Sequence, residues 1–160
     1  MANKIYQTQE TARTWAASGG DEVLTLTSLA TNTGRKGDGH DWGASHAGRV
    51  IVELEIAFGT GPTAGNIVEV YWCSSRDNSQ FDGNLAAGDA AASDTDIHKQ
   101  LHFVGALRCD NVTTVQRQSW IFWLPGRYGF PVVFNASGQT TTSTAGDNTL
   151  VITPYPDEVQ

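Results

Sequence analysis

The chain has 160 residues, of which ten are basic and seventeen acidic, and its formal net charge is −7. Only 17% of its residues are charged, against about 25% in a typical soluble domain. The few, dispersed Lys and Arg residues disfavour nucleic-acid binding, which depends on clustered positive charge. No run reaches the ~18 apolar residues of a membrane-spanning helix, and the first ten residues lack the apolar stretch of a secretory signal. We therefore expect a folded protein that is made in the cytoplasm, with no nucleic-acid and no membrane partner.

Period-two alternation of apolar and polar residues recurs along the chain and predicts strands. In chain order, the predicted strands are 6–15, 23–29, 49–58, 67–74, 101–109, 118–124, 128–135 and 148–154. Segment 6–15 alternates most weakly. Segment 49–58 alternates most clearly and places Glu53 and Glu55 on one face. The turn at 59–65 is too short for a crossover helix, so strands 49–58 and 67–74 are expected to form an antiparallel hairpin.

Two long segments, 30–48 and 76–99, interrupt the strands and are expected to be loops. Helical periodicity is absent, and the best candidate for a single helical turn is 85–92. Seven or eight short strands separated by Gly-, Ser- and Asn-rich turns favour an all-β fold. We predict an antiparallel β-sandwich of the jelly-roll type, with one sandwich domain over 17–160 and an extended N-terminal arm over 1–16.

Two groups of histidines and aspartates are candidate metal sites. Loop 37–46 contains His40, His46 and two aspartates, all residue types that ligate divalent ions. No fixed ligand spacing is present, so a flexible polar loop is the favoured interpretation, with a metal as the open alternative. The second group is His98 with His102, which on a strand would stand ~13 Å apart. We therefore predict no metal and no cofactor.

Cys73 and Cys109, the two cysteines, match no zinc or redox spacing and are expected to be free thiols, with a disulfide between them as the minority alternative. A catalytic site is not expected either. The chain has no G-x-S-x-G elbow, and outward carboxylates such as Glu53 and Glu55 are typical of a solvated sheet face. A small hydrolase built on loop 37–46 stays open as the least favoured alternative.

The aromatic residues fall into two groups, according to whether they lie on the apolar side of a predicted strand. Trp72, Trp120, Phe122 and Phe134 fall on apolar parities and are predicted to lie in the core. The others fall in loops or on the opposite parity, namely Trp15, Trp42, Tyr71 and Trp123. Exposed aromatic rings stack on sugars or dominate protein interfaces, although the N-terminal segment could equally cover them.

The C-terminal third resembles a recurrent segment of tailed-bacteriophage structural proteins. It contains Leu124-Pro125-Gly126-Arg127-Tyr128, then Asn135-Ala136-Ser137-Gly138, and ends with Thr153-Pro154. The upstream segment 67–78 is also similar, and the resemblance covers about residues 49–155. It implies a capsid decoration, or cement, protein: a jelly-roll-like domain that commonly trimerises and sits on the shell where capsomers meet. Similar small β-domains also serve as tail or fibre components.

The resemblance implies a structural virion protein, and the catalytic motifs considered above do not favour an enzyme. We expect it to be made in the bacterial host cytoplasm and to reinforce the capsid surface, with the major capsid protein and itself, as a homotrimer, for partners. The N-terminal segment could add as a strand to a neighbour, with Ile5, Tyr6 and Trp15 as anchors. The alternative is a carbohydrate- or receptor-binding sandwich module of a phage tail or fibre that uses Trp42 and Trp123.

Overall fold

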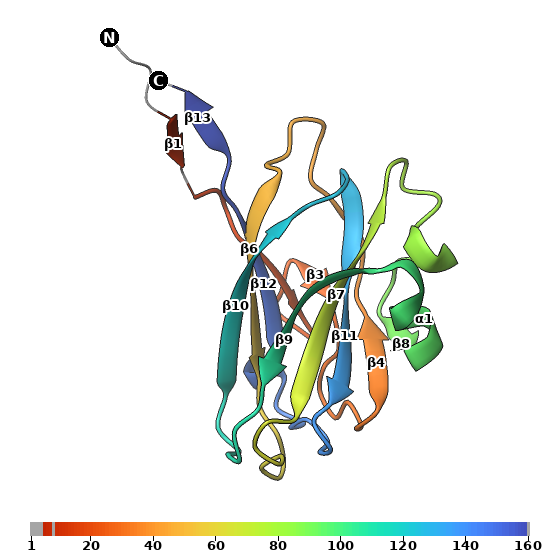
Figure 1. Cartoon of the computed structure of the whole chain (residues 1–160), viewed down its shortest axis with the longest axis vertical. Helices are drawn as coiled ribbons and strands as arrows, with labels where there is room; N and C mark the ends of the chain where they lie inside the picture. Colours follow the sequence, from red (N-terminus) through yellow and green to blue (C-terminus); the bar gives the residue numbers. More distant parts are fainter. Residues whose placement is uncertain (1–4, 8, 160) are drawn as a thin grey trace.

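Two β-sheets pack face to face in the computed structural model, which describes residues 5–7 and 9–159 (Figure 1). The five-stranded sheet has the order β10 (Gln116–Trp123), β6 (Arg49–Ile56), β12 (Thr149–Pro154), β2 (Arg13–Ala16) and β3 (Glu22–Val23). The six-stranded sheet has the order β8 (Ala90–Ala92), β4 (Thr33–Lys36), β11 (Tyr128–Ala136), β7 (Ile67–Ser75) and β9 (His102–Arg108), with β5 (His40–Asp41) also on β11. The predicted all-β sandwich is confirmed.

A third sheet joins the two ends of the chain. It consists of β1 (Ile5–Gln7) and β13 (Asp157–Val159), which pair antiparallel and project beyond the sandwich (Figure 1). The helical elements are α1 (Asp94–Gln100) and the 3₁₀ turns η1 (Asp82–Asn84) and η2 (Ala145–Asp147). Among the described strands, β2 and β3 pair parallel and the other pairs are antiparallel.

The main core lies between the two large sheets. Along β6, every second residue is buried, as the alternation predicts, and Val50, Val52 and Leu54 are at most 1% exposed. Trp15 of β2 and Trp72 of β7 meet edge to face from opposite sheets, with ring centroids 6.2 Å apart. Such aromatic pairs add about 0.5–1.5 kcal/mol to the stabilisation from area burial alone. The alternation in the sequence therefore predicts the inward residues of β6, but it did not predict the burial of Trp15.

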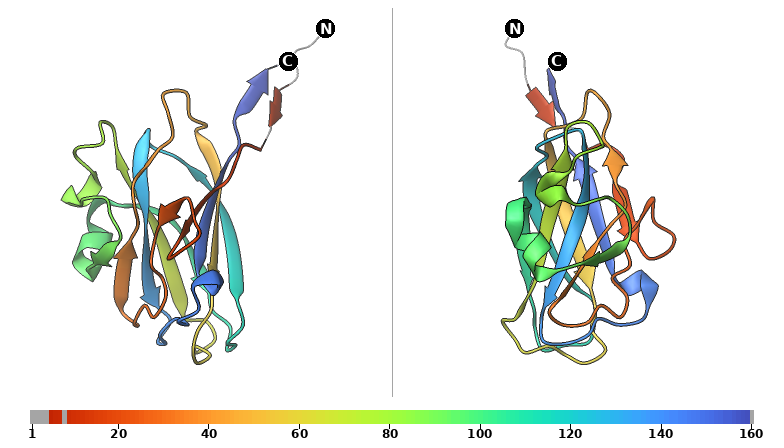
Figure 2. Two further views of the ribbon diagram at one scale, coloured as in Figure 1. Left: turned by 180° about the vertical axis from the view of Figure 1, so that it is seen from behind. Right: turned by 90° about the vertical axis from the view of Figure 1, so that its right-hand side faces the viewer.

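A second apolar cluster covers the outer face of the six-stranded sheet. It joins Tyr71 of β7 and Phe130 and Phe134 of β11 to Ile97 of α1, which is 1% exposed. Phe81 also packs on Phe130, with ring centroids 5.1 Å apart. The segment predicted as a long loop thus covers this sheet, and Figure 2 shows α1 on that side of the molecule. Tyr71 is covered by this segment and not by the N-terminal one.

The turn after β11 is held by one buried amide. The Nδ2 of Asn135 donates to the carbonyls of Leu29 and Gln139, and its Oδ1 accepts from the N–H and hydroxyl of Ser137. Gly138 then adopts a φ of +81°, a conformation that glycine reaches without a Cβ clash. The Asn-x-Ser-Gly sequence that carries part of the resemblance is therefore a turn built around a satisfied buried side chain.

Several predictions of local structure are wrong. Of the predicted strand 23–29, only Val23 lies in a strand, and the predicted loop 30–48 contains β4 and β5. Strands β6 and β7 do not form a hairpin, since they belong to different sheets and the 57–66 connection crosses between them. Residues 85–92 form no helix. The helix is α1, in the stretch expected to be a loop running into a strand. A short helix packed on a sheet face gains its stability from tertiary contacts, which local periodicity does not register.

The predicted N-terminal arm over 1–16 is not seen as one unit. Its last four residues are β2, paired with β12 inside the five-stranded sheet, so the sandwich takes in residues before 17. Residues 5–7 instead pair with 157–159 outside the sandwich. Segment 6–15, read as one weak strand, is thus two strands in two sheets. The jelly-roll topology stays a prediction.

Candidate functional site

The outer face of the five-stranded sheet carries the most exposed large apolar side chains of the described chain. Trp123 is 66% and Ile121 69% exposed, both pointing outward from the edge strand β10. Their cross-strand neighbours on β6 are Arg49 and Ile51. Tyr155 is held beside them by its backbone N–H, which donates to the Arg49 carbonyl. We call these five residues the sheet face.

A shallow apolar groove of about 150 Å³ lies within the sheet face, lined by Arg49, Ile51, Ile121 and Tyr155. A cavity of about that volume can hold a benzene-sized group. Trp123 stands at its side, over the backbone of Gly48, where an added Cβ would lie 3.6 Å from the indole ring. The groove thus has room for one apolar side chain beside a flat exposed ring.

A polar end lies where β5, the start of β11 and the start of β2 come together. Arg127 donates through Nε and Nη2 to both carboxylate oxygens of Asp41, at 2.6 and 2.7 Å. These bonds, and one from the Gly43 N–H, lower the pKa of Asp41 to about 2. The pair separates two open depressions. One, of about 540 Å³, is lined by Ser74, Ser75, Arg76, Gln80, Asp82, Pro125, Gly126 and Arg127. The other, of about 450 Å³, is lined by Gln9, Glu10, Thr11, Arg13, His40, Asp41, Trp42 and Pro154.

Trp42 is partly buried and packs against the main core. Its ring lies 6.1 Å from Trp15 and 6.3 Å from Trp72, and 4.6 Å from His40, measured between centroids. Within the described chain, its Nε1 is buried and has no hydrogen-bond partner. Loop 37–46 is therefore anchored by an aromatic cluster. Of the two tryptophans considered for sugar stacking, Trp123 alone has an exposed ring.

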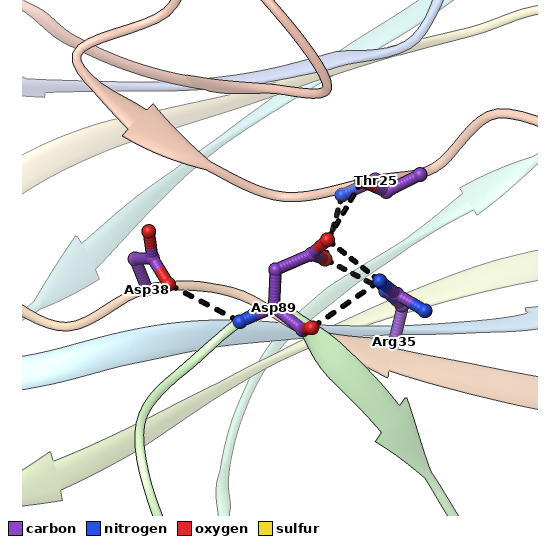
Figure 3. Close-up of polar contacts among 4 residues, drawn as sticks. All are labelled: Thr25, Arg35, Asp38 and Asp89. Atoms are coloured by element: carbon purple, nitrogen blue, oxygen red, sulfur yellow. Dashed lines mark hydrogen bonds and ion pairs between the residues drawn. The ribbon is translucent and has the colours of Figure 1, made fainter.

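A charged cluster ties three segments together beside the six-stranded sheet (Figure 3). The carboxylate of Asp89 accepts from Nε and Nη2 of Arg35 at 2.7 and 2.6 Å, and from the N–H and hydroxyl of Thr25. The Asp89 N–H donates to Asp38 Oδ1. The Arg35 bonds lower the pKa of Asp89 to about 2, and those from Thr25 contribute. Both carboxylate oxygens of Asp89 are engaged by Arg35 and Thr25, so the cluster joins three segments as a structural latch.

The histidines of loop 37–46 do not come together as a metal site, and the side chain of His98, from the second candidate group, lies outside the described set. His40 Nδ1 lies 2.8 Å from Glu22 Oε1, whereas His46 Nδ1 lies 3.2 Å from the Gly43 carbonyl. His102 faces Asp82 at 3.3 Å from another part of the fold. Among the side chains that the structure describes, no group of three or more His, Cys, Asp or Glu residues is placed to hold a metal ion.

Both cysteines are buried free thiols in different apolar clusters. Burial raises the pKa of Cys73 to about 12 and that of Cys109 to about 11. A thiol with such a pKa is almost wholly protonated near neutral pH and is a poor nucleophile. Glu53 and Glu55 do share the outer face of β6, as predicted, and Glu55 is engaged by Arg117.

The three predicted anchors fall in two places. Ile5 and Tyr6 lie in β1, paired with Val159 and Glu158 through the backbone, and their side chains lie outside the described set. Trp15 is 0% exposed in the main core, where its Nε1 donates to the Asp38 carbonyl. Its side chain is therefore occupied with internal packing and is not offered to a partner. The alternation of residues along the strands could not show the burial of Trp15, because residue 15 was assigned to the N-terminal arm.

No protein-family model matches the chain, and no curated protein shows significant sequence similarity to it. Within the described residues, the helices are too short or too polar to cross a bilayer. The fold and its surfaces define a two-sheet β-sandwich with one exposed apolar sheet face, a polar end and a projecting pair of terminal strands.

Proposed function

We propose that the protein is a structural component of a tailed-phage virion that decorates the capsid and binds major capsid protein subunits. The resemblance of the C-terminal third motivates the proposal. The observation that supports it most directly is the projecting ribbon of β1 and β13. A protein that binds only the assembled shell stabilises that shell by mass action.

The projecting ribbon suits attachment to a neighbouring subunit. Two paired strands leave two outer edges, and an unpaired strand edge is a template for backbone hydrogen bonding to another chain. The ribbon contains both Ile5 and Tyr6, which were predicted as anchors, and it stands clear of the sandwich (Figure 1). Because β2 begins at Arg13 and β12 ends at Pro154, the ribbon can be removed without cutting either large sheet.

Deletion of residues 1–8 together with 156–160 tests this attachment. Empty capsids made without this protein, from the phage that encodes it, would be mixed with each variant and sedimented. We expect the deletion to abolish co-sedimentation while the midpoint of thermal unfolding stays within about 3 °C of the full chain, roughly 1 kcal/mol. An Arg76→Glu variant, changed only in an exposed loop, should bind fully.

Two outcomes would overturn different parts of the proposal. Full capsid binding by the deletion variant would remove the ribbon as the anchor. Failure of the full chain to bind any assembled capsid would remove the decoration function itself. Electron cryo-microscopy of the phage particle would locate the protein on the head, tail or fibre.

A second candidate function is recognition of a carbohydrate receptor by a tail or fibre module. It is favoured by the polar depression next to β5, which presents Gln9, Glu10 and Arg13 around an aromatic floor. A glycan array with the full chain, Glu10→Gln and Trp123→Ala separates the sites. Loss with Glu10→Gln places the ligand in the depression, loss with Trp123→Ala places it on the sheet face, and no binding to any glycan rejects this candidate.

A further inference from the structure

The two large sheets differ in how their outer faces are protected. The outer face of the six-stranded sheet is closed by α1 and its flanking segments, with Ile97 only 1% exposed. On the five-stranded sheet, the outward residues of β10 stay exposed along the whole strand, Trp123 and Ile121 included. This apolar surface is independent of the proposed attachment to a capsid.

The outward residues of β10, β6 and β12 form three short rows across the sheet. The strand register sets them: the first row is Trp123, Arg49 and Tyr155, the middle row is Ile121, Ile51 and Thr153, and the third row is Ser119, Glu53 and Val151. The middle row is uncharged. One cation lies on one side of it and one anion on the other.

The two charges that flank the middle row are not neutralised by any described residue of the chain. Among the described residues, neither Arg49 nor Glu53 has a side-chain hydrogen bond or an ion pair. The next outward pair along the same strands differs, because Arg117 engages Glu55. The strand β6 therefore presents one unpaired cation and one unpaired anion, two residues to either side of Ile51.

We infer that this face binds the same face of a second copy of the chain. The two-fold axis lies parallel to the sheets, perpendicular to the strands, and passes over Ile51 and Ile121. It brings the middle rows together and places Arg49 of each copy opposite Glu53 of the other. The Tyr155 ring then meets Val151, and the groove beside Ile51 receives an aliphatic side chain from the second copy.

The arrangement of charges selects this orientation. A two-fold axis parallel to the strands would instead stack Arg49 on Arg49 and Glu53 on Glu53, and like charges in contact disfavour association. Aligned packing of two sheets at about 10 Å, with strands close to antiparallel, is a common way for two sheet faces to meet. A self-complementary patch of this kind is what an isologous dimer requires.

The proposed contact between the two copies is small, and its size sets the dimer affinity that we expect. Nine residues per copy fall below the roughly 20–30 residues per side of a standard interface, so the dimer should be reversible, with a Kd of about 10–100 µM. When a face binds the same face of a second copy, both faces are occupied and no third copy can add. This contact therefore gives a dimer, in contrast to the homotrimer that the resemblance implies.

Charge reversal tests the axis directly. Sedimentation velocity of the full chain at about 0.15 M salt, which screens the repulsion between two chains of charge −7 beyond about 8 Å, should show a monomer–dimer equilibrium. Arg49→Glu and Glu53→Arg should each weaken the dimer at least about tenfold, because each sets like charges opposite one another. Arg76→Glu, with the same charge change on an exposed loop, is the matched control.

Mixing the two variants gives the decisive result. Each variant alone repels itself, but Arg49→Glu and Glu53→Arg are complementary in the proposed geometry. An equimolar mixture should dimerise again, and so should the double variant Arg49→Glu/Glu53→Arg. No rescue in either experiment would overturn the proposed axis. A trimer, or a full chain that is monomeric up to about 1 mM, well above the expected Kd, would overturn the dimer.

An apolar substitution provides an independent check. Ile121→Ser should weaken the dimer, because the middle row meets across the axis, and should leave the fold intact, because this side chain is 69% exposed. Phe103→Ser, at a similarly exposed position on β9 of the other sheet, should leave the dimer unchanged. Equal effects of the two substitutions would contradict the assignment of the sheet face.

Discussion

Removal of the Asp89 carboxylate should cost a substantial part of the stability of the sandwich. In Asp89→Ala, four hydrogen bonds are lost at once, two from Arg35 and two from Thr25. The Thr25 N–H is left without its acceptor, and the Arg35 guanidinium, 28% exposed, keeps only the backbone carbonyl of residue 89 at 3.2 Å. Hydrogen bonds to a charged group contribute about 1.5–3 kcal/mol each, and loss of one partner of a buried pair costs about 3–5 kcal/mol. Because the cluster retains some solvent access, we expect a loss of about 3 kcal/mol.

Urea unfolding followed by Trp fluorescence, together with thermal unfolding, measures this loss. For a domain of this size, about 3 kcal/mol corresponds to a fall in Tm of about 6–12 °C. Asp110→Ala, an exposed aspartate with no side-chain contact among those described, is the matched control and should change stability by less than about 0.5 kcal/mol. A double-mutant cycle with Arg35→Ala should recover at least about 1 kcal/mol of coupling. If Asp89→Ala costs no more than the control, the latch has no structural role.

Three further predictions concern the folded state. Since the pKa of Asp89 is lowered in the fold, its contribution is present above pH ~4 and lost as the pH falls toward about 2, so Tm should decrease over that range and Asp89→Asn should flatten the decrease. Gly129→Ala should destabilise by about 1–3 kcal/mol in urea unfolding, because a Cβ there would lie 2.5 Å from the Trp72 ring. Cys73 and Cys109 should both resist a thiol reagent at pH 8 and react after unfolding, and rapid labelling of the native protein would contradict their burial.

The strands and their faces could be predicted because the signal is local. Side chains on a strand alternate with a period of two, so the burial of β6, β10 and β12 follows from the order of their residues. The same alternation carries no information on which strand lies alongside. It therefore misassigned β6 and β7 as a hairpin, although each pairs with strands distant in the sequence. It also missed α1, whose apolar contact with the sheet comes mainly through Ile97.

The candidate surfaces were predicted less well than the strands. Exposure of Trp123 was among the expectations for residues of its parity, but Trp15, Trp42 and Tyr71 shared that class and lie wholly or partly in the apolar clusters. A ring on the outward parity is exposed only if no distant segment covers it. For Tyr71, the cover comes mostly from the 76–99 segment, which local patterns assigned to a loop.

The sequence alone determined the β-rich class, the parity of each main strand and the shared face of Glu53 and Glu55, because these follow from alternation along one strand. Only the tertiary structure decided which face stays open and which charges find partners. Arg35 meets Asp89 across 54 positions, whereas Arg49 and Glu53, two residues to either side of Ile51, find no partner among the described residues. Charge neutralisation and burial depend on distances between distant segments, and those distances exist only once the two sheets have packed together.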